Sequence, residues 1–222
     1  MAASAAYMAR MSFSNDLTRR AVLAGVGAAA LAPVASHAAP RKVVTILGDS
    51  ITSGYGLSSS VALPAQLQAQ IDALRAPAVI RGAGVAGDTS STGLARLDRA
   101  VRSDTDVCVV ALGGNDLLTL TDPAVTRANL DRIIRRLKTR GIAVVLVGVG
   151  APAELGAYAR AFNAVYPALA RQHGVPLYAD ILAGVARDRA LNQPDGIHPN
   201  ARGVAVIARR LAPVVREAMK RA

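Results

Sequence analysis

Residues 42–50 read KVVTILGDS, an apolar run that is rich in β-branched residues and stops at Gly48-Asp49-Ser50. This composition favours a β-strand over a helix. Because the run is apolar along its whole length, we expect the strand to lie in a parallel sheet that helices cover on both sides. The hydroxyl of Ser50 then lies just beyond the carboxyl end of the strand.

The segments that follow alternate between helix-like and strand-like patterns. Leu63, Leu67, Ile71 and Leu74 share one helical stripe, which is typical of an amphipathic helix. We expect helices over residues 62–74, 90–101, 123–140, 154–173 and 200–220, and further strands over 77–83, 106–112, 142–149 and 175–179. Apolar strands separated by helices predict an α/β protein, a three-layer α/β/α sandwich around a parallel sheet of about five strands.

Three residues with chemical or conformational roles follow three of the predicted strands. Ser50, Gly87 and Asn115 each come just after the carboxyl end of a different strand. Ligands of parallel α/β sheets bind outside these carboxyl ends, so we expect the three residues to share one rim of the sheet. The loop DGIHPN at residues 195–200, which leads into the last predicted helix, can reach the same rim.

The chain contains three histidines, and His198 in this loop is the one suited to catalysis. An imidazole exchanges protons near neutral pH, because its unperturbed pKa is about 6.5. His37 lies in a predicted leader segment, and His173 precedes Gly174 at a predicted helix end, where a histidine can cap the helix. His198 is therefore the expected general base.

Together these residues meet the requirements of acyl transfer. Ser50 supplies a nucleophile, and His198 activates it by removing its proton. Asp195 holds the opposite ring nitrogen and stabilises the imidazolium. The backbone N–H groups of Ser50 and Gly87 and the side-chain amide of Asn115 are candidate donors to a tetrahedral oxyanion. The predicted catalytic residues are thus Ser50, Asp195 and His198, and the predicted oxyanion hole is Ser50, Gly87 and Asn115.

A competing interpretation comes from residues 82–87 (GAGVAG), whose glycines fit the G-x-G-x-x-G fingerprint of dinucleotide-binding sites. In that fingerprint the glycines open a helix, whereas here residues 88–90 (DTS) follow them as the predicted helix cap. Asp106 has the spacing of a ribose-binding acid but begins a strand where such an acid should end one. The context therefore argues against a dinucleotide site.

The formal net charge of +11 raises nucleic acids and membrane surfaces as partners. The arginines are spread along amphipathic segments, and only 3% of the residues are aromatic, so we do not expect a base-stacking surface. Cys108 is the single cysteine, which excludes an intrachain disulfide and a cysteine-based metal site. It falls inside a predicted strand, where we expect a buried apolar side chain.

Residues 1–38 have the order of an export signal: the pair Arg19-Arg20, then an apolar run, then small residues that end at Ala38. The apolar run is shorter than the roughly 20 residues that span a bilayer. The arginine pair resembles a twin-arginine signal. We expect cleavage after Ala38, one domain over residues 39–222, and a periplasmic or secreted mature protein. The alternatives are an uncleaved N-terminal anchor and a true start at Met8 or Met11.

In order along the chain stand the stretches Gly48-Asp49-Ser50, Gly87, Gly113-Gly114-Asn115-Asp116 and Asp195-Gly196-Ile197-His198-Pro199. They resemble the conserved blocks of the SGNH (GDSL-type) hydrolases, and the resemblance covers roughly residues 42–215. The chain looks most similar to the bacterial periplasmic branch of multifunctional acyl-CoA thioesterases, lysophospholipases and arylesterases. This resemblance implies a flavodoxin-like α/β/α fold, the triad and oxyanion hole given above, and no metal or cofactor. It also implies that Asp49 supports the nucleophile turn without taking part in the chemistry.

Two stretches depart from that branch. After Asp116 the chain has Leu117-Leu118-Thr119-Leu120 where Gly-Leu-Arg-Gly is common. Residues 148–156 lack the polar and aromatic residues that are often found there. We expect the leucines to line an apolar acyl groove, and the alternative is that they only pack the loop. The predicted substrate-binding residues are Leu117, Leu118 and Leu120.

The sequence thus predicts an exported serine hydrolase that cleaves acyl esters or thioesters through an acyl-enzyme on Ser50. The expected partner is a small-molecule acyl ester or thioester; we expect no nucleic acid, no stable membrane anchor after signal removal, and a monomer. A carbohydrate O-acetyl esterase on the same fold is the alternative among enzymes, which the leucines and the lack of Trp disfavour. A flavodoxin-like ligand-binding module without hydrolysis is the alternative of another class.

Overall fold

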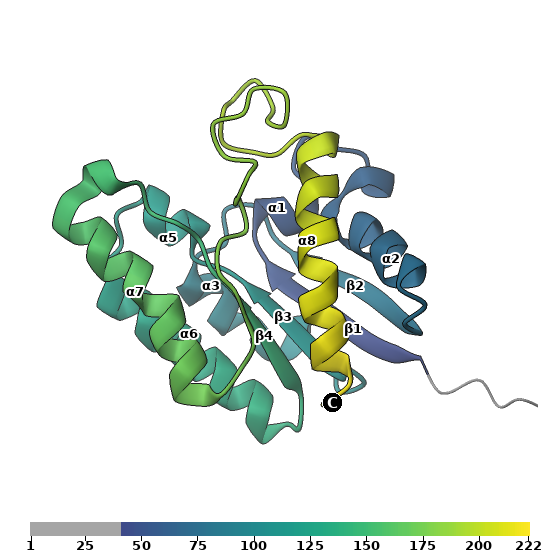
Figure 1. Cartoon of the computed structure of the whole chain (residues 1–222). Helices are drawn as coiled ribbons and strands as arrows, with labels where there is room; N and C mark the ends of the chain where they lie inside the picture. Colours follow the sequence, from purple (N-terminus) through teal and green to yellow (C-terminus); the bar gives the residue numbers. More distant parts are fainter. Residues whose placement is uncertain (1–40) are drawn as a thin grey trace, which may run out of the picture. The chain divides into compact units, whose positions relative to one another are not determined.

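The computed structural model describes residues 41–222, so the predicted leader at residues 1–38 lies outside the described residues. Five parallel strands form one sheet in the order β2-β1-β3-β4-β5 (Figure 1). The strands are β1 (Lys42–Gly48), β2 (Ala78–Gly84), β3 (Val107–Ala111), β4 (Ala143–Val147) and β5 (Leu177–Tyr178). The predicted parallel sheet of about five strands is confirmed.

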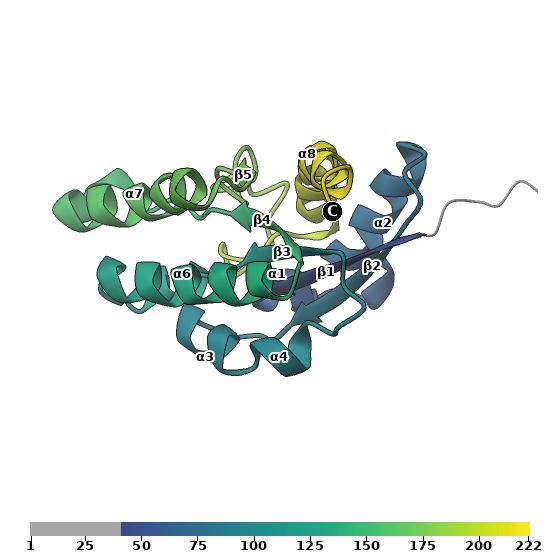
Figure 2. The ribbon, with the colours of Figure 1, turned by 90° about the horizontal axis from the view of Figure 1, so that it is seen from below.

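Helices cover the sheet on both sides, which confirms the predicted three-layer α/β/α sandwich. Figure 2 shows α2 and α8 on one side of the sheet and α3, α4 and α6 on the other. The α-helices are α1 (Ser50–Ser53), α2 (Leu63–Ala73), α3 (Ser90–Ala95), α4 (Leu97–Ala100), α5 (Gly114–Leu118), α6 (Pro123–Thr139), α7 (Gly156–His173) and α8 (Ala201–Met219). Short 3₁₀ turns are η1 (Ser59–Val61) and η2 (Ala153–Leu155).

The buried side chains form two clusters, one on each face of the sheet. Val44 and Ile46 of β1 pack against α2 and α8, whereas Leu47 packs on the opposite face with α4, α6 and α7. Successive strand residues point to opposite faces, so a strand covered on both sides must be apolar along its whole length. Cys108 of β3 is fully buried in the second cluster, as the sequence predicts.

The strand order reverses at β1, and this reversal locates the rim at which the predicted site residues gather. The chain passes from β1 to β2 on one side and then crosses back to β3 on the other. A crevice opens beyond the carboxyl ends of two strands that diverge in this way. Ser50 follows β1 and Asn115 follows β3, so they flank the crevice, and Gly87 follows the neighbouring strand β2.

Two predicted helices differ in detail. The helix expected over residues 90–101 is divided into α3 and α4 at Arg96, whose φ of −102° and ψ of 5° leave helical geometry. Its guanidinium reaches back to the carboxyl ends of β1 and β2. The helix expected from residue 154 begins as the turn η2, and α7 starts at Gly156, whose φ of +55° a glycine adopts readily.

His173 does not cap its helix as expected. Gly174, in the left-handed conformation, is the C-cap of α7. The His173 ring instead lies against α6, with its Nε2 2.7 Å from Asp131 Oδ1. The imidazole therefore joins two helices, far along the chain from the predicted catalytic loop.

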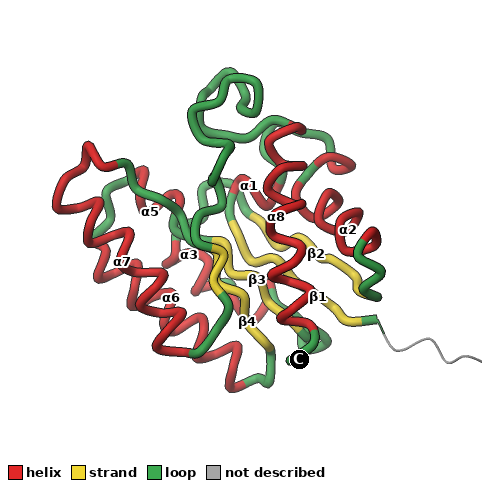
Figure 3. The backbone as a smooth tube through the Cα atoms, in the orientation of Figure 1, coloured by secondary structure: helices red, strands yellow, loops and turns green. Residues whose placement is uncertain are grey.

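A long loop, residues 179–200, leads from β5 across the carboxyl edge of the sheet to α8 (Figure 3). It ends at Asn200, which caps α8: its Oδ1 accepts the N–H groups of Arg202 and Gly203 at 3.0 and 3.1 Å. The Asn200 Nδ2 donates to the carbonyl of Ala190 at 3.0 Å. One side chain therefore fastens the loop to the helix, two residues after His198.

Candidate active site

Ser50 begins α1 directly after β1 ends. Asp49 caps this short helix, because its Oδ1 accepts the N–H of Ile51 at 3.0 Å. Gly48 is required before the turn, since a Cβ there would lie 2.1 Å from Thr52 Oγ1. The strand, the glycine and the capped turn together hold the Ser50 hydroxyl at the rim, and Asp49 has the supporting contact that the resemblance implies.

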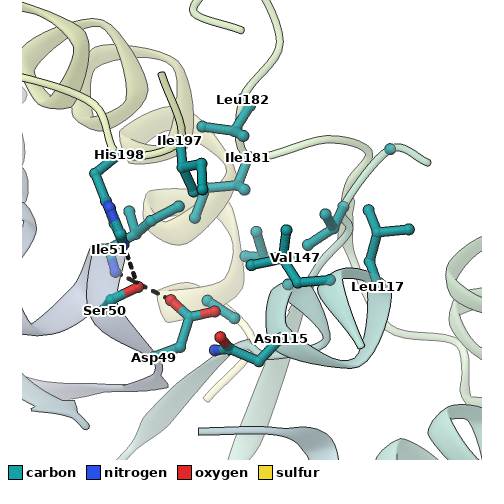
Figure 4. A pocket seen from close by; sticks show the side chains of 15 residues that line it. Asp49, Ser50, Ile51, Asn115, Leu117, Val147, Ile181, Leu182, Ile197 and His198 are labelled. Carbon is teal, nitrogen blue, oxygen red and sulfur yellow. Dashed lines mark hydrogen bonds between the residues drawn. The ribbon is translucent and has the colours of Figure 1, made fainter. Parts of the chain in front are cut away.

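The structure brings Ser50, His198 and Asp195 together in one chain of hydrogen bonds. His198 Nε2 lies 2.9 Å from Ser50 Oγ, and its Nδ1 lies 2.6 Å from Asp195 Oδ2. Figure 4 shows Ser50 and His198 on the same side of a pocket. An ionised carboxylate only accepts hydrogen bonds, so Nδ1 donates to Asp195 and Nε2 is left to accept the serine proton. This is the geometry that a general base needs beside a nucleophile.

The carboxylate of Asp195 is held ionised by donors from its own loop. The backbone N–H of His198, its imidazole and the backbone N–H of Ile197 all donate to it, and together they lower the pKa of Asp195 from 3.8 to about 2. Protonation of this carboxyl therefore does not compete with its role as an acceptor near neutral pH. The order D-G-x-H produces these bonds because a turn brings the carboxylate under the amides two and three residues ahead.

Gln193 fastens the histidine loop to the loop after α1. Its side-chain amide donates to the carbonyls of Tyr55 and Pro199 at 2.8 and 3.0 Å, and its backbone N–H donates to the carbonyl of His198 at 2.8 Å. The Tyr55 ring lies against the imidazole, with the ring centroids 4.7 Å apart. The sequence analysis missed both residues, since a contact between positions 138 apart leaves no local pattern.

The predicted oxyanion donors lie after three neighbouring strands. Ser50 is the first residue of α1, so its N–H has no acceptor within the helix. Gly87 has a φ of +84°, and a Cβ there would meet nothing within 4 Å. Asn115 Nδ2 donates one hydrogen to the carbonyl of Asp88 at 2.8 Å and keeps its second for a ligand. Ser50 and Asn115 line one pocket, whereas Gly87 does not; the residue after Gly87, Asp88, accepts the Asn115 hydrogen bond.

An apolar pocket of about 120 Å³ opens beside Ser50. In Figure 4, Leu117 lies across the pocket from Ser50, and Ile181 and Ile197 lie on a third side. Of the three leucines predicted to bind substrate, Leu117 and Leu118 line this pocket, whereas Leu120 does not. The chain turns at Leu120, which has a φ of +51° and a side chain that is 57% exposed. Only Leu117 and Leu118 therefore remain candidates for contact with a substrate in this pocket.

Residues 46–206 match the GDSL-like Lipase/Acylhydrolase family. The chain belongs to this family. It is 36% identical over 185 residues to thioesterase 1/protease 1/lysophospholipase L1 of Escherichia coli, covering 81% of this chain and 88% of that protein. It is 35% identical over 175 residues to esterase TesA of Pseudomonas aeruginosa, covering 78% of this chain and 87% of that protein.

Comparison with a solved structure supports the family assignment. The crystal structure of AlinE4, an SGNH-hydrolase family esterase, superposes with a TM-score of 0.68 at 37% identity, covering 82% of this chain and 98% of that one. The protein is accordingly an ester hydrolase of the GDSL type, as the sequence predicts.

In this GDSL-type hydrolase a buried acidic residue of the Gly113–Asp116 stretch holds the site together. Asp116 is 1% exposed and accepts the N–H of Ser90 at 2.7 Å and the Thr126 hydroxyl at 3.1 Å. It ties α3 and α6 to α5, next to Asn115. Asp116 belongs to a stretch that was singled out in the sequence, but its contacts with Ser90 and Thr126 could not be predicted from the sequence. Among residues 41–222, no three His, Cys, Asp or Glu side chains gather as metal ligands would.

Besides Asp195, a second acidic residue lies near Ser50: Asp49, whose carboxyl is buried. Burial raises its pKa from 3.8 to about 6, against the opposing effects of the Ile51 N–H and the nearby His198. Because the pKa is higher in the folded state than in the unfolded one, the folded state binds this proton more tightly. The hydrolase therefore loses stability as the pH rises through this interval.

Asp49→Asn should change how stability depends on pH. An amide still accepts the Ile51 N–H but carries no charge, so the variant avoids the cost of burying an ionised carboxylate. The free energy of unfolding of the variant minus that of the wild type should rise by about 2 to 3 kcal/mol between about pH 4 and pH 7. Urea denaturation at a series of pH values measures the difference.

Asp188→Asn is the matched control. Asp188 accepts the N–H of Ala190 at 2.8 Å, two residues ahead, but in an exposed position, so burial adds nothing to its cost. The free energy of unfolding of this variant minus that of the wild type should not show the rise expected for Asp49→Asn. A level difference for Asp49→Asn as well would contradict the prediction.

Proposed function

We propose that the protein hydrolyses acyl esters and thioesters through an acyl-enzyme on Ser50. The observation that carries this proposal is the hydrogen-bonded order Asp195, His198, Ser50, with distances of 2.6 and 2.9 Å, at the mouth of an apolar pocket. The family assignment supports hydrolysis over a ligand-binding module without activity.

The reaction would begin when His198 Nε2 takes the proton of Ser50 Oγ. The oxygen attacks the carbonyl carbon of the substrate, and the carbonyl oxygen becomes an oxyanion. The backbone N–H groups of Ser50 and Gly87 and the free hydrogen of Asn115 Nδ2 stabilise this charge, each by roughly 3 kcal/mol in comparable sites. His198 then returns its proton to the leaving alcohol or thiol. A water, activated by the same imidazole, releases the acid and restores Ser50.

Asp195 would contribute orientation and charge rather than proton transfer. Its pKa of about 2 keeps it ionised while His198 cycles between neutral and protonated forms. It therefore holds Nδ1 as the donor and stabilises the imidazolium. The ring of Tyr55 lies against the same imidazole, and Gln193 bonds the backbone carbonyl of Tyr55.

The pocket supports an acyl substrate over a sugar ester. Its walls are aliphatic, with Leu117, Leu118, Ile181 and Ile197 among them, and its polar side chains stand at the catalytic end. Burying a methylene group contributes about 0.8 kcal/mol, so such walls favour a chain of several carbons. The named activities of the relatives, thioesterase, lysophospholipase and esterase, agree with acyl substrates of this kind. A carbohydrate O-acetyl esterase would need polar or stacking surfaces that this lining does not offer.

Ser50→Ala should lower kcat at least about 10⁴-fold on p-nitrophenyl esters, because it removes the nucleophile and leaves the pocket intact. A fluorophosphonate probe should label the wild type at Ser50 alone and leave the variant unlabelled, as located by peptide mass spectrometry. Ser53→Ala is the matched control: this exposed serine lies one turn along α1, and its loss should leave kcat within about three-fold. Substantial activity in Ser50→Ala would contradict the assignment of the nucleophile.

Val149→Phe should shorten the acyl chain that the enzyme prefers. Val149 follows β4 and lines the pocket, so a larger ring would fill part of its roughly 120 Å³. In a series of p-nitrophenyl esters from acetate to palmitate, kcat/KM should fall by about 10- to 100-fold for the longer chains and within about three-fold for acetate. Val125→Phe, at an exposed position of α6, is the matched control and should leave the profile unchanged. Equal losses at every chain length would argue against this pocket as the acyl site.

We also propose that residues 1–38 direct export, supported by their order of arginine pair, apolar run and small residues. Within residues 41–222, no helix is both long and apolar enough to cross a membrane. Protein recovered from the periplasm or medium should begin at Ala39 by N-terminal sequencing. Recovery of the intact N-terminus from the membrane fraction would instead support an uncleaved anchor.

A further inference from the structure

Arg96 stands at the break between α3 and α4 and turns its side chain into the protein. The side chain is 13% exposed. Its Nε donates to Asp88 Oδ2 at 2.5 Å, and its Nη2 donates to the carbonyls of Gly48 and Ala83 at 3.0 and 2.8 Å. Asp88 is itself 6% exposed. One guanidinium therefore satisfies a buried carboxylate and two strand-end carbonyls.

These acceptors belong to the segments that carry the oxyanion donors. Gly48 ends β1, two residues before Ser50. Asp88 directly follows Gly87, and its backbone carbonyl accepts the Nδ2 of Asn115 at 2.8 Å. Gly87 is thus adjacent to Asp88 in the chain, Asn115 is one hydrogen bond from Asp88, and Ser50 lies two residues after an acceptor of Arg96. Neither Arg96 nor Asp88 lines the pocket, so the pair acts without touching the substrate.

The chemistry of the pair explains why an arginine occupies this position. A guanidinium presents several donors in one rigid plane, whereas a lysine ammonium is a single point that cannot match acceptors on two strands and a carboxylate together. Removing one partner of a buried pair leaves the other charge uncompensated, so the surrounding segments must shift. A shift of about 1 Å at reacting groups can cost on the order of 100-fold in rate.

We propose that Arg96 and Asp88 are positioning residues that set the geometry of the oxyanion hole. This inference rests on the proposed function of Ser50, Gly87 and Asn115. The pair holds the carboxyl ends of β1 and β2 and the Asn115 amide in one arrangement, so it acts on the transition state more than on the bound ester.

The first test compares Arg96→Gln with Arg140→Gln, using a short p-nitrophenyl ester. Arg140 also donates to a backbone carbonyl, that of Val101, and pairs with Asp98, but it lies after α6, away from the site. Arg96→Gln should lower kcat about 10- to 100-fold with KM within about three-fold. The kcat of Arg96→Lys should lie between that of Arg96→Gln and that of the wild type. Arg140→Gln should lower the melting temperature about as much as Arg96→Gln does, yet keep kcat within about two-fold of the wild type.

The second test is a double-mutant cycle. Asn115→Ala alone should lower kcat roughly 100- to 1000-fold. If Arg96 acts in part through this donor, adding Arg96→Gln to Asn115→Ala should lower kcat by less than Arg96→Gln does in the wild type, since one of the groups that Arg96 positions is already gone. The proposal would be overturned if the loss of kcat in the double variant equalled the product of the two single losses. It would also be overturned if the kcat of Arg96→Gln stayed within about two-fold of the wild type.

Two further results distinguish a failure of the Arg96–Asp88 proposal from a failure of the proposed oxyanion hole. Full activity in Asn115→Ala would refute the oxyanion assignment itself, whatever Arg96→Gln does. If Arg96→Gln does not fold, Asp88→Asn provides the same comparison, because it keeps the shape and the backbone carbonyl but removes the charge. Asp88→Asn should then lower kcat with KM within about three-fold, and an unchanged kcat would overturn the pair's role.

Discussion

The hydrogen bond between His198 Nε2 and Ser50 Oγ joins residues 148 positions apart. It depends on the register of three strands, in which Gly48 of β1 pairs with Gly84 of β2 and with Ala111 of β3. A slip of one residue would move Ser50 by about 3.3 Å, more than a hydrogen bond tolerates. Strand pairing in the interior therefore influences whether the Ser50 hydroxyl and the His198 imidazole can meet at the rim.

Three carboxylates around this rim have different surroundings and hence different uses. Asp195 receives three N–H donors, which keep its pKa near 2 and leave it ionised beside the imidazole. Asp49 is buried with the Ile51 N–H as a donor to its Oδ1, and burial raises its pKa to about 6. Asp88 is equally buried but lies against Arg96, which supplies a full opposite charge. One residue type thus serves as an orienting acceptor, a helix cap and half of an ion pair.

The strands and the rim could be predicted because each depends on a few consecutive residues. The run that forms β1 is mostly apolar, and Ser50 stands two residues after its end, so the sequence pattern places Ser50 at the rim. The division of the helix at Arg96 could not be predicted, since its cause is a set of acceptors on other segments. The same holds for Gln193, whose partner Tyr55 lies far along the chain. Leu117 and Leu120 are the same residue type, but α5 ends at Leu118 and only Leu117 lines the pocket. The residue type alone could not distinguish them.

Cys108 sits in the middle of β3 with no exposed surface, and burial raises the pKa of its thiol to about 12. A thiol that stays protonated and inaccessible neither attacks an ester nor exchanges with disulfides. An acyl group on the proposed nucleophile would consequently find no reactive thiol inside the fold, and its fate would rest with water or an incoming acceptor. With no second cysteine in the sequence, no intrachain disulfide can form, so the fold does not depend on a disulfide.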